Sequence, residues 1–301
     1  TTAKSSAASD VYKRQAVQSA VEFGAEAIGL LRSEFLVPED EQLPDAAFYR
    51  SEFRKLCETA AGLPLTIRLF DVAASKRPSW LSLGPVDAGV LGRQGVRLYA
   101  DEPVHGIYLA QLQAIAELAP EFEVRVLLPY VADLAELQYW HDDIKRQLVY
   151  PLSIGAMAET PAAALQLREW LEVVEFVAIG CNDLMQCLFG ADRDVPELRR
   201  YLDWYSPALY RFLRQVADTV QGRLDAVQLC GVLPQLPGIL PLLLGLGYRV
   251  FSVEATLLSY LRPTIVGTHA GEARILAERV CQAHSSAAVR EILGQTEHWQ
   301  T

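Results

Sequence analysis

The chain has 301 residues, a formal net charge of −10 and a hydrophobic content of 51%. A net negative charge of this size argues against a general nucleic-acid-binding surface, so any pocket for an anion must be local. The closest candidate for a membrane span, at 239–247, is broken by Pro and Gly and is shorter than the roughly 18 residues that a spanning helix needs. We therefore expect neither nucleic acid nor a membrane as a partner.

Residues 1–15 (TTAKSSAASDVYKRQ) are rich in Ser, Thr and Ala and lack an apolar period. We expect this stretch to be a foreign or disordered leader, and the gene to be truncated upstream. The cysteine content points to a reducing, cytoplasmic location, because five cysteines without a C-x-x-C pair favour free thiols over a disulfide framework. There is no signal-peptide pattern.

Short apolar runs typical of buried strands alternate with amphipathic segments typical of helices from Ala27 to about Val253. The expected strands lie near 27–31, 65–69, 124–129, 152–158, 174–180, 226–230 and 248–252, with a weaker one near 95–99. This alternation predicts a (β/α)8 barrel over 16–265, followed by a helical tail over 266–301, because such barrels take about 250 residues. A doubly wound open sheet remains the structural alternative, since periodicity does not prove closure.

Charged or reactive residues stand where several of these strands end, and parallel barrels gather their catalytic groups at that rim. They are Arg32, Arg68, Glu159, Asp183 and Cys230. Guanidinium groups with carboxylates at one rim favour a phosphorylated substrate and a hard divalent cation.

Glu159 and Asp183 follow neighbouring strands, so both carboxylates are expected to reach one magnesium ion. The alternative is that each caps a helix. Arg32 and Arg68 are expected to grip a phosphoryl group, whereas the alternative is ion pairing with Glu34 and Asp71.

Cys230 is either a proton donor at a strand end or a small buried core residue.

These motifs together resemble the carboxy-terminal, phosphoenolpyruvate-binding barrel of enzyme I of the sugar phosphotransferase system, the phosphoenolpyruvate–protein phosphotransferases. The matching segments, in the family's order, are Ile28–Leu36 (IGLLRSEFL), Leu65–Asp71 (LTIRLFD), Val126–Tyr130 (VLLPY), Ile154–Ala163 (IGAMAETPAA) and Ile179–Arg193 (IGCNDLMQCLFGADR). The resemblance runs from about Val21 to Arg262 and implies a TIM barrel of the phosphoenolpyruvate/pyruvate-binding type.

The resemblance implies a role for each matching residue. Arg32, Arg68 and the nearby Lys76 would hold the phosphate of phosphoenolpyruvate, and Asn182 and Arg193 would bind its other anionic groups.

By the same resemblance, Glu159 and Asp183 would hold Mg²⁺, and Cys230 would protonate the enolate carbon and release pyruvate. The partners it implies are phosphoenolpyruvate and pyruvate, a phosphohistidine domain in the full-length protein, a small phosphocarrier protein and a second copy of the chain in a homodimer.

The chain departs from the family's pattern at three places near this rim. The family's Gly-Gly-Asp is Ala73-Ala74-Ser75 here, its first arginine after Leu-Gly is Gln94, and the acidic residue after Cys-Gly is Val232. Two further functions therefore stay open beside a phosphotransferase. One is a diverged, non-catalytic module that binds phosphoenolpyruvate or dimerises, and the other is a magnesium-dependent lyase on a related barrel.

Overall fold

The computed structural model describes residues 6–11, 13–38, 42–72, 78, 80–81, 92–148, 150–220 and 222–295. Eight parallel strands form a closed barrel in the order β1 to β8, and the pairing of β1 with β8 closes it, so the open sheet is excluded. The strands are β1 (Ser6–Val11), β2 (Ala27–Arg32), β3 (Leu65–Arg68), β4 (Val124–Val131), β5 (Ser153–Ala158), β6 (Phe176–Gly180), β7 (Val227–Cys230) and β8 (Val250–Glu254).

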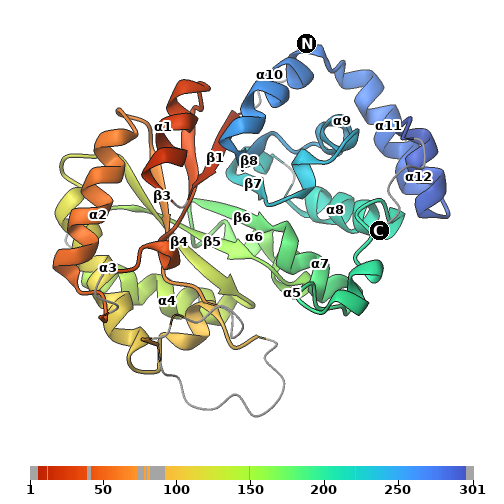
Figure 1. Cartoon of the computed structure of the whole chain (residues 1–301). Helices are drawn as coiled ribbons and strands as arrows, with labels where there is room; N and C mark the ends of the chain where they lie inside the picture. Colours follow the sequence, from red (N-terminus) through yellow and green to blue (C-terminus); the bar gives the residue numbers. More distant parts are fainter. Residues whose placement is uncertain are drawn as a thin grey trace.

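Helices follow the strands and pack around the outside of the barrel (Figure 1). They are α1 (Arg14–Glu22), α2 (Ala46–Thr59), α3 (Val104–Leu118), α4 (Leu134–Gln147), α5 (Pro161–Ala164), α6 (Leu167–Trp170), α7 (Cys181–Phe189), α8 (Pro207–Thr219) and α9 (Ile239–Gly245), then α10 (Leu258–Gly267), α11 (Ala270–Gln282) and α12 (Ser286–Ile292). The (β/α)8 barrel predicted from the sequence is thus the observed fold. Within the described ranges no helix is both long and apolar enough to cross a membrane.

The prediction of a leader over residues 1–15 is wrong for Ser6–Val11, which forms the first strand of the barrel between β2 and β8. Before Val11 the strand has only small or polar residues, which give a weak apolar signal. A Cβ atom added at Gly29 of β2 would lie 2.7 Å from both the Ala8 Cβ and the Ser252 Oγ atoms. Small residues are what this part of the interior admits, and their apolar signal is weak.

The weaker strand expected near 95–99 is also wrong, since Gly95–Leu98 forms the 3₁₀ helix η3. Val96 and Leu98 are buried, so the apolar run reflects core packing and not a sheet. Gly95 has a φ of 58° and its N–H donates to the Asp71 Oδ1 atom at 2.9 Å. The turn therefore brings Gln94 to the rim of the barrel.

Two helices of the tail follow Gly267, and arginines of α8 hold the end of the first of them. The Arg211 side chain donates to the carbonyls of Cys281 at 2.7 Å and Ala283 at 2.6 Å, and Arg214 donates to that of Ala277. The Arg211 bonds satisfy two carbonyls, at the carboxyl end of α11 and just after it, that have no partner within the helix.

Candidate functional site

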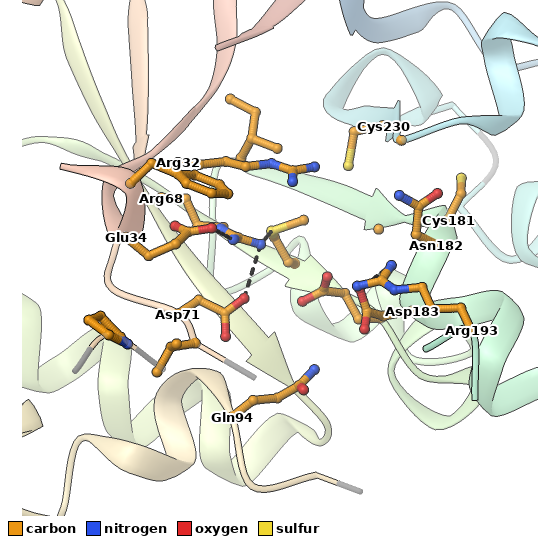
Figure 2. A pocket seen from close by; sticks show the side chains of 18 of the residues that line it. Arg32, Glu34, Arg68, Asp71, Gln94, Cys181, Asn182, Asp183, Arg193 and Cys230 are labelled. Carbon is orange, nitrogen blue, oxygen red and sulfur yellow. Dashed lines mark hydrogen bonds and ion pairs between the residues drawn. The ribbon is translucent and has the colours of Figure 1, made fainter. Parts of the chain in front are cut away.

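A cavity of about 360 Å³ lies at the carboxyl end of the barrel, where the residues after β2, β3, β5, β6 and β7 meet (Figure 2). Its walls include Leu30, Arg32, Glu34, Arg68, Asp71, Gln94, Met157, Glu159, Asn182, Asp183, Arg193 and Cys230. The prediction that the strand-end residues meet at one rim is therefore confirmed. Lys76, the remaining expected site residue, lies outside the described residues.

Arg68 is buried at the end of β3 and is already paired with two carboxylates. Its Nη1 atom lies 3.0 Å from the Asp71 Oδ2 atom, and its Nη2 atom forms a short ion pair with Glu34 (Figure 2). Burial disfavours the cation, but these carboxylates outweigh it and raise the pKa of Arg68. The ion-pairing alternative thus holds for Arg68, and of its nitrogens only Nε is buried without a partner.

Arg32 ends β2 directly beside Arg68, its register partner on β3. It lines the cavity and, within the part of the chain that the structure describes, it forms no ion pair. Burial raises the pKa values of Glu34 and Asp71, and the positive charges of Arg68 and, to a smaller extent, Arg32 act in the opposite direction. Among the described residues, ion pairing therefore leaves the Arg32 guanidinium available to an anion.

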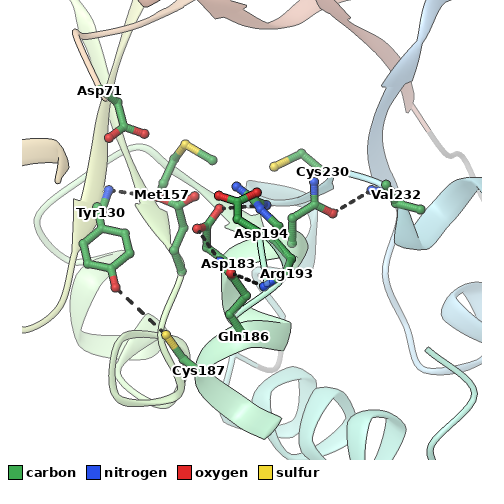
Figure 3. A network of polar contacts seen from close by, with 12 residues as sticks. Asp71, Tyr130, Met157, Asp183, Gln186, Cys187, Arg193, Asp194, Cys230 and Val232 are labelled. Atoms are coloured by element: carbon green, nitrogen blue, oxygen red, sulfur yellow. Dashed lines mark hydrogen bonds and ion pairs between the residues drawn. The ribbon is translucent and has the colours of Figure 1, made fainter. Parts of the chain in front are cut away.

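Glu159 follows β5 and is buried, with its carboxylate held by the backbone of the neighbouring strand. The Tyr130 N–H donates to the Glu159 Oε2 atom at 3.0 Å, from a residue with a φ of 52° (Figure 3). A Cβ atom added at Gly180 would lie 2.6 Å from the Glu159 Oε1 atom, so only glycine leaves room for this carboxylate. The helix-cap alternative fails here, because Thr160 caps α5 by accepting from the Ala163 N–H.

Burial, followed by the charges of Asp183 and Asp71, raises the pKa of Glu159 to about 8. The Arg68 cation and the Tyr130 N–H act in the opposite direction. Such repulsion among carboxylates is what a bound divalent cation relieves, and carboxylate oxygens suit magnesium. Glu159 and Asp183 therefore fit the expected ion. In the described ranges no cluster of three or more His, Cys, Asp or Glu side chains could hold a metal by itself, so water and substrate would complete the coordination.

The first turn of α7 carries Asn182 and Asp183, and a short network holds both side chains (Figure 3). The Arg193 Nη1 atom lies 3.4 Å from the Asp183 Oδ2 atom, and Gln186 donates to the Asp183 Oδ1 atom at 3.1 Å. The Asn182 Oδ1 atom accepts from the Val232 N–H at 3.1 Å. Gln186 was not singled out from the sequence, although its spacing of three from Asp183 on a helix was the available signal.

Cys230 ends β7 and donates from its Sγ atom to the Ile179 carbonyl at 3.3 Å. It belongs to a small buried cluster inside the barrel, formed with Leu30, Leu127, Met157 and Ala178. It also lines the cavity, so it is a core residue that borders the site, and its role as a proton donor stays a prediction.

The described cavity walls carry three guanidinium groups and four carboxylates, which leaves a formal excess of one negative charge. Gln94 enters the cavity from η3, opposite Cys230, without adding a charge (Figure 2). An anion can enter such a cavity favourably only together with a cation or proton. The arrangement suits an anionic substrate bound with a divalent metal ion.

Comparison with known proteins gives one family model, that of the phosphoenolpyruvate-binding domain of phosphoenolpyruvate-utilising enzymes, which matches residues 2–269. A phosphoenolpyruvate–protein phosphotransferase of Streptomyces coelicolor is 34% identical over 83% of this chain and 45% of that protein. One of Haloferax volcanii is 30% identical over 91% of this chain and 50% of that protein. Multiphosphoryl transfer protein 1 of Escherichia coli is 26% identical over 90% of this chain and 34% of that protein.

The chain thus spans about half or less of the length of these relatives. Among solved structures, a citrate lyase of Burkholderia xenovorans matches with a TM-score of 0.52 at 11% identity, over 97% of this chain and 91% of that one. At this identity the likeness shows the fold alone.

Proposed function

This chain belongs to the phosphoenolpyruvate-utilising enzymes, whose phosphoenolpyruvate-binding domain it contains, and we propose that it is the substrate-binding barrel of a phosphoenolpyruvate–protein phosphotransferase. The observation that carries the proposal is the meeting of an available guanidinium, a carboxylate pair and a thiol at one cavity. Phosphoryl transfer from an enol phosphate requires positive charge at the phosphoryl group, which the guanidinium and a metal held by the carboxylates would supply. It also requires a proton donor at the methylene carbon, which the thiol would supply.

In this proposal Arg32 binds the phosphoryl group, and Arg68 beside it orients the site through its ion pairs with Glu34 and Asp71. Arg193 and Asn182 bind the carboxylate end of the substrate. Glu159 and Asp183 would hold Mg²⁺, which when bound neutralises oxygen charge that spreads during transfer. The burial of Glu159 and the N–H of Tyr130 fix the orientation of one ligand before substrate arrives.

Cys230 is the proposed general acid. When the P–O bond breaks, the phosphoryl group passes to a histidine nitrogen and the electron pair of that bond stays on the enolate. The Cys230 thiol then donates its proton to the methylene carbon, which gives pyruvate and a thiolate that regains a proton from water. The accepting histidine, a small phosphocarrier and a homodimer of the barrel are proposals that rest on the relatives and on the resemblance.

Calorimetry with phosphoenolpyruvate, in the presence and absence of Mg²⁺, tests the binding half of the proposal. The expected result is Mg²⁺-dependent binding that Glu159→Ala removes. A matched control is Glu117→Ala on the outer surface of α3, where the carboxylate is half-exposed and pairs with Arg50. Affinity unaffected by Mg²⁺ and by Glu159→Ala would reject the metal site.

A second candidate is the non-catalytic binding module, and Gln94 favours it. This side chain lines the cavity where the family's motif places an arginine, so the phosphate meets one charge fewer. A module of this kind would bind phosphoenolpyruvate but would not exchange protons at the methylene carbon, which separates it from the enzyme.

A further inference from the structure

Gln111 is fully buried on α3, outside the barrel, yet its amide reaches two strand ends of the site. Its Oε1 atom accepts from the Phe70 N–H at 2.7 Å, and its Nε2 atom donates to the Ser33 Oγ atom at 2.9 Å. A buried amide with both ends paired to other segments fixes those segments relative to one another.

The two partners of Gln111 stand between charged residues of the cavity. Ser33 lies between Arg32 and Glu34, and Phe70 directly precedes Asp71. Gln111 therefore fixes the backbone or side chain of the residues just after β2 and β3, next to the charged residues that line the cavity.

The regular pairing of β2 with β3 ends at Arg32 and Arg68. Beyond that pair the two chains have no register partners, and the Gln111 amide spans the gap between Ser33 and Phe70. The Phe70 carbonyl is also held, because it accepts from the Tyr99 hydroxyl at 2.9 Å. Both backbone groups of Phe70 are thus fixed by buried side chains from outside the barrel.

We propose that Gln111 is a positioning residue of the site, which sets the spacing between the Arg32–Glu34 and Arg68–Asp71 segments. The inference rests on the proposed function, because it assigns the phosphoryl end of the substrate to these segments. Gln111 is not among the described residues that line the cavity, so its effect passes through its hydrogen bonds to Ser33 and Phe70.

A positioning role and a merely stabilising role differ in which ligand they affect. Phosphoenolpyruvate uses the phosphoryl end and the metal end of the cavity. Oxalate, a planar dianion that resembles the enolate of pyruvate, carries no phosphoryl group and uses the metal end alone. Displacement of the β2 and β3 ends weakens the binding of phosphoenolpyruvate selectively. General destabilisation of the barrel weakens the binding of both phosphoenolpyruvate and oxalate.

The test is calorimetry on the full chain with Mg²⁺ and each ligand, comparing wild type, Gln111→Met and Gln113→Met. Methionine keeps the length and apolar contacts of Gln111 but makes neither hydrogen bond. Gln113 is the matched control, because it lies exposed on the same helix. Gln111→Met is expected to weaken phosphoenolpyruvate binding at least about tenfold, as misplaced binding groups do. Its oxalate affinity, and both affinities of Gln113→Met, should stay within about twofold of wild type.

Equal losses for both ligands in Gln111→Met, or no loss for phosphoenolpyruvate, would overturn the inference. If Gln111→Met does not fold, Ser33→Ala decides, because it removes one arm of the bridge without a change of volume in α3. A phosphoenolpyruvate-selective loss in Ser33→Ala supports the inference, and unchanged affinity overturns it. Failure of the wild-type chain to bind either ligand would instead reject the proposed function itself.

Discussion

Replacing Gln94 by arginine tests how much of the expected phosphate site this chain has kept. Gln94 lines the cavity from η3, and its neighbour Gly95 is fixed by the hydrogen bond to Asp71. An arginine side chain starting at this position enters the cavity on the side opposite Cys230. It would offset the formal excess of negative charge on the described walls.

The size of the effect follows from two opposing contacts. A hydrogen bond between a guanidinium and a phosphoryl oxygen contributes about 1.5–3 kcal/mol. Asp71 lies beside the new guanidinium and competes for it, although Arg68 and the Gly95 N–H already occupy that carboxylate. We therefore expect the lower end of the range, which is about a tenfold tighter Kd for phosphoenolpyruvate.

Calorimetry with Mg²⁺ and phosphoenolpyruvate measures this change, and Gln113→Arg supplies the control. That variant adds the same charge on the outer surface of α3, where binding should change less than about twofold. Unchanged or weaker phosphoenolpyruvate binding in Gln94→Arg, together with unchanged binding in Gln113→Arg, would refute the reasoning. The cavity would then be built around Gln94, and the non-catalytic module would become the leading function.

Three further predictions concern the proton chemistry and assembly of the chain. The pKa of Glu159, raised from 4.5 to about 8, means that the folded chain keeps a proton in this window that the unfolded chain has released. Metal-free stability should therefore fall as the pH rises from about 4.5 to 8, and thermal melts of Glu159→Gln should show a flatter profile; an equally steep profile would contradict the assignment. In D₂O with Mg²⁺, wild type should exchange the methyl protons of pyruvate, and Cys230→Ser should slow exchange by at least about a hundredfold by NMR; equal rates would exclude Cys230. Light scattering at about tens of micromolar should give a dimer, and a monomer would count against the proposed homodimer.

Much of the fold was predictable because large β-branched and aliphatic residues mark most of the strands. Ser6–Val11 was not, since its residues before Val11 are small or polar, and even the Cβ of Ala8 would lie 2.7 Å from a Cβ atom added at Gly29. Gly95–Leu98 misled in the opposite direction, because Val96 and Leu98 are buried without belonging to the sheet. An apolar run in the sequence indicates that the segment is buried, and not which secondary structure it adopts. A strand made of small or polar residues gives no such signal.

The members of the site were predictable for a different reason. Parallel strands must end on the same rim, so residues at strand ends converge whatever their separation in sequence. The pairing of those residues was not predictable. The sequence spacing predicted an ion pair between Glu34 and Arg32. In the structure Glu34 pairs instead with Arg68, at the end of the neighbouring strand β3. Gln111 was hidden as well, because an isolated glutamine in a helix gives no signal of what its amide will reach.

The pairing of Arg68 with Glu34 and Asp71 changes how an anion can bind. A guanidinium held by two carboxylates contributes little net charge, so Arg32 carries most of the attraction that the β2–β3 rim offers a phosphoryl group. At the opposite wall, Glu159 and Asp183 repel any anion until a proton or a cation neutralises them. Below about pH 8 the proton on Glu159 removes the formal excess of negative charge, whereas at higher pH a cation would have to enter before phosphoenolpyruvate or together with it. The need for a neutralising proton or cation arises from all four carboxylates of the cavity. Glu34 and Asp71, which pair with Arg68, contribute to it as well as Glu159 and Asp183.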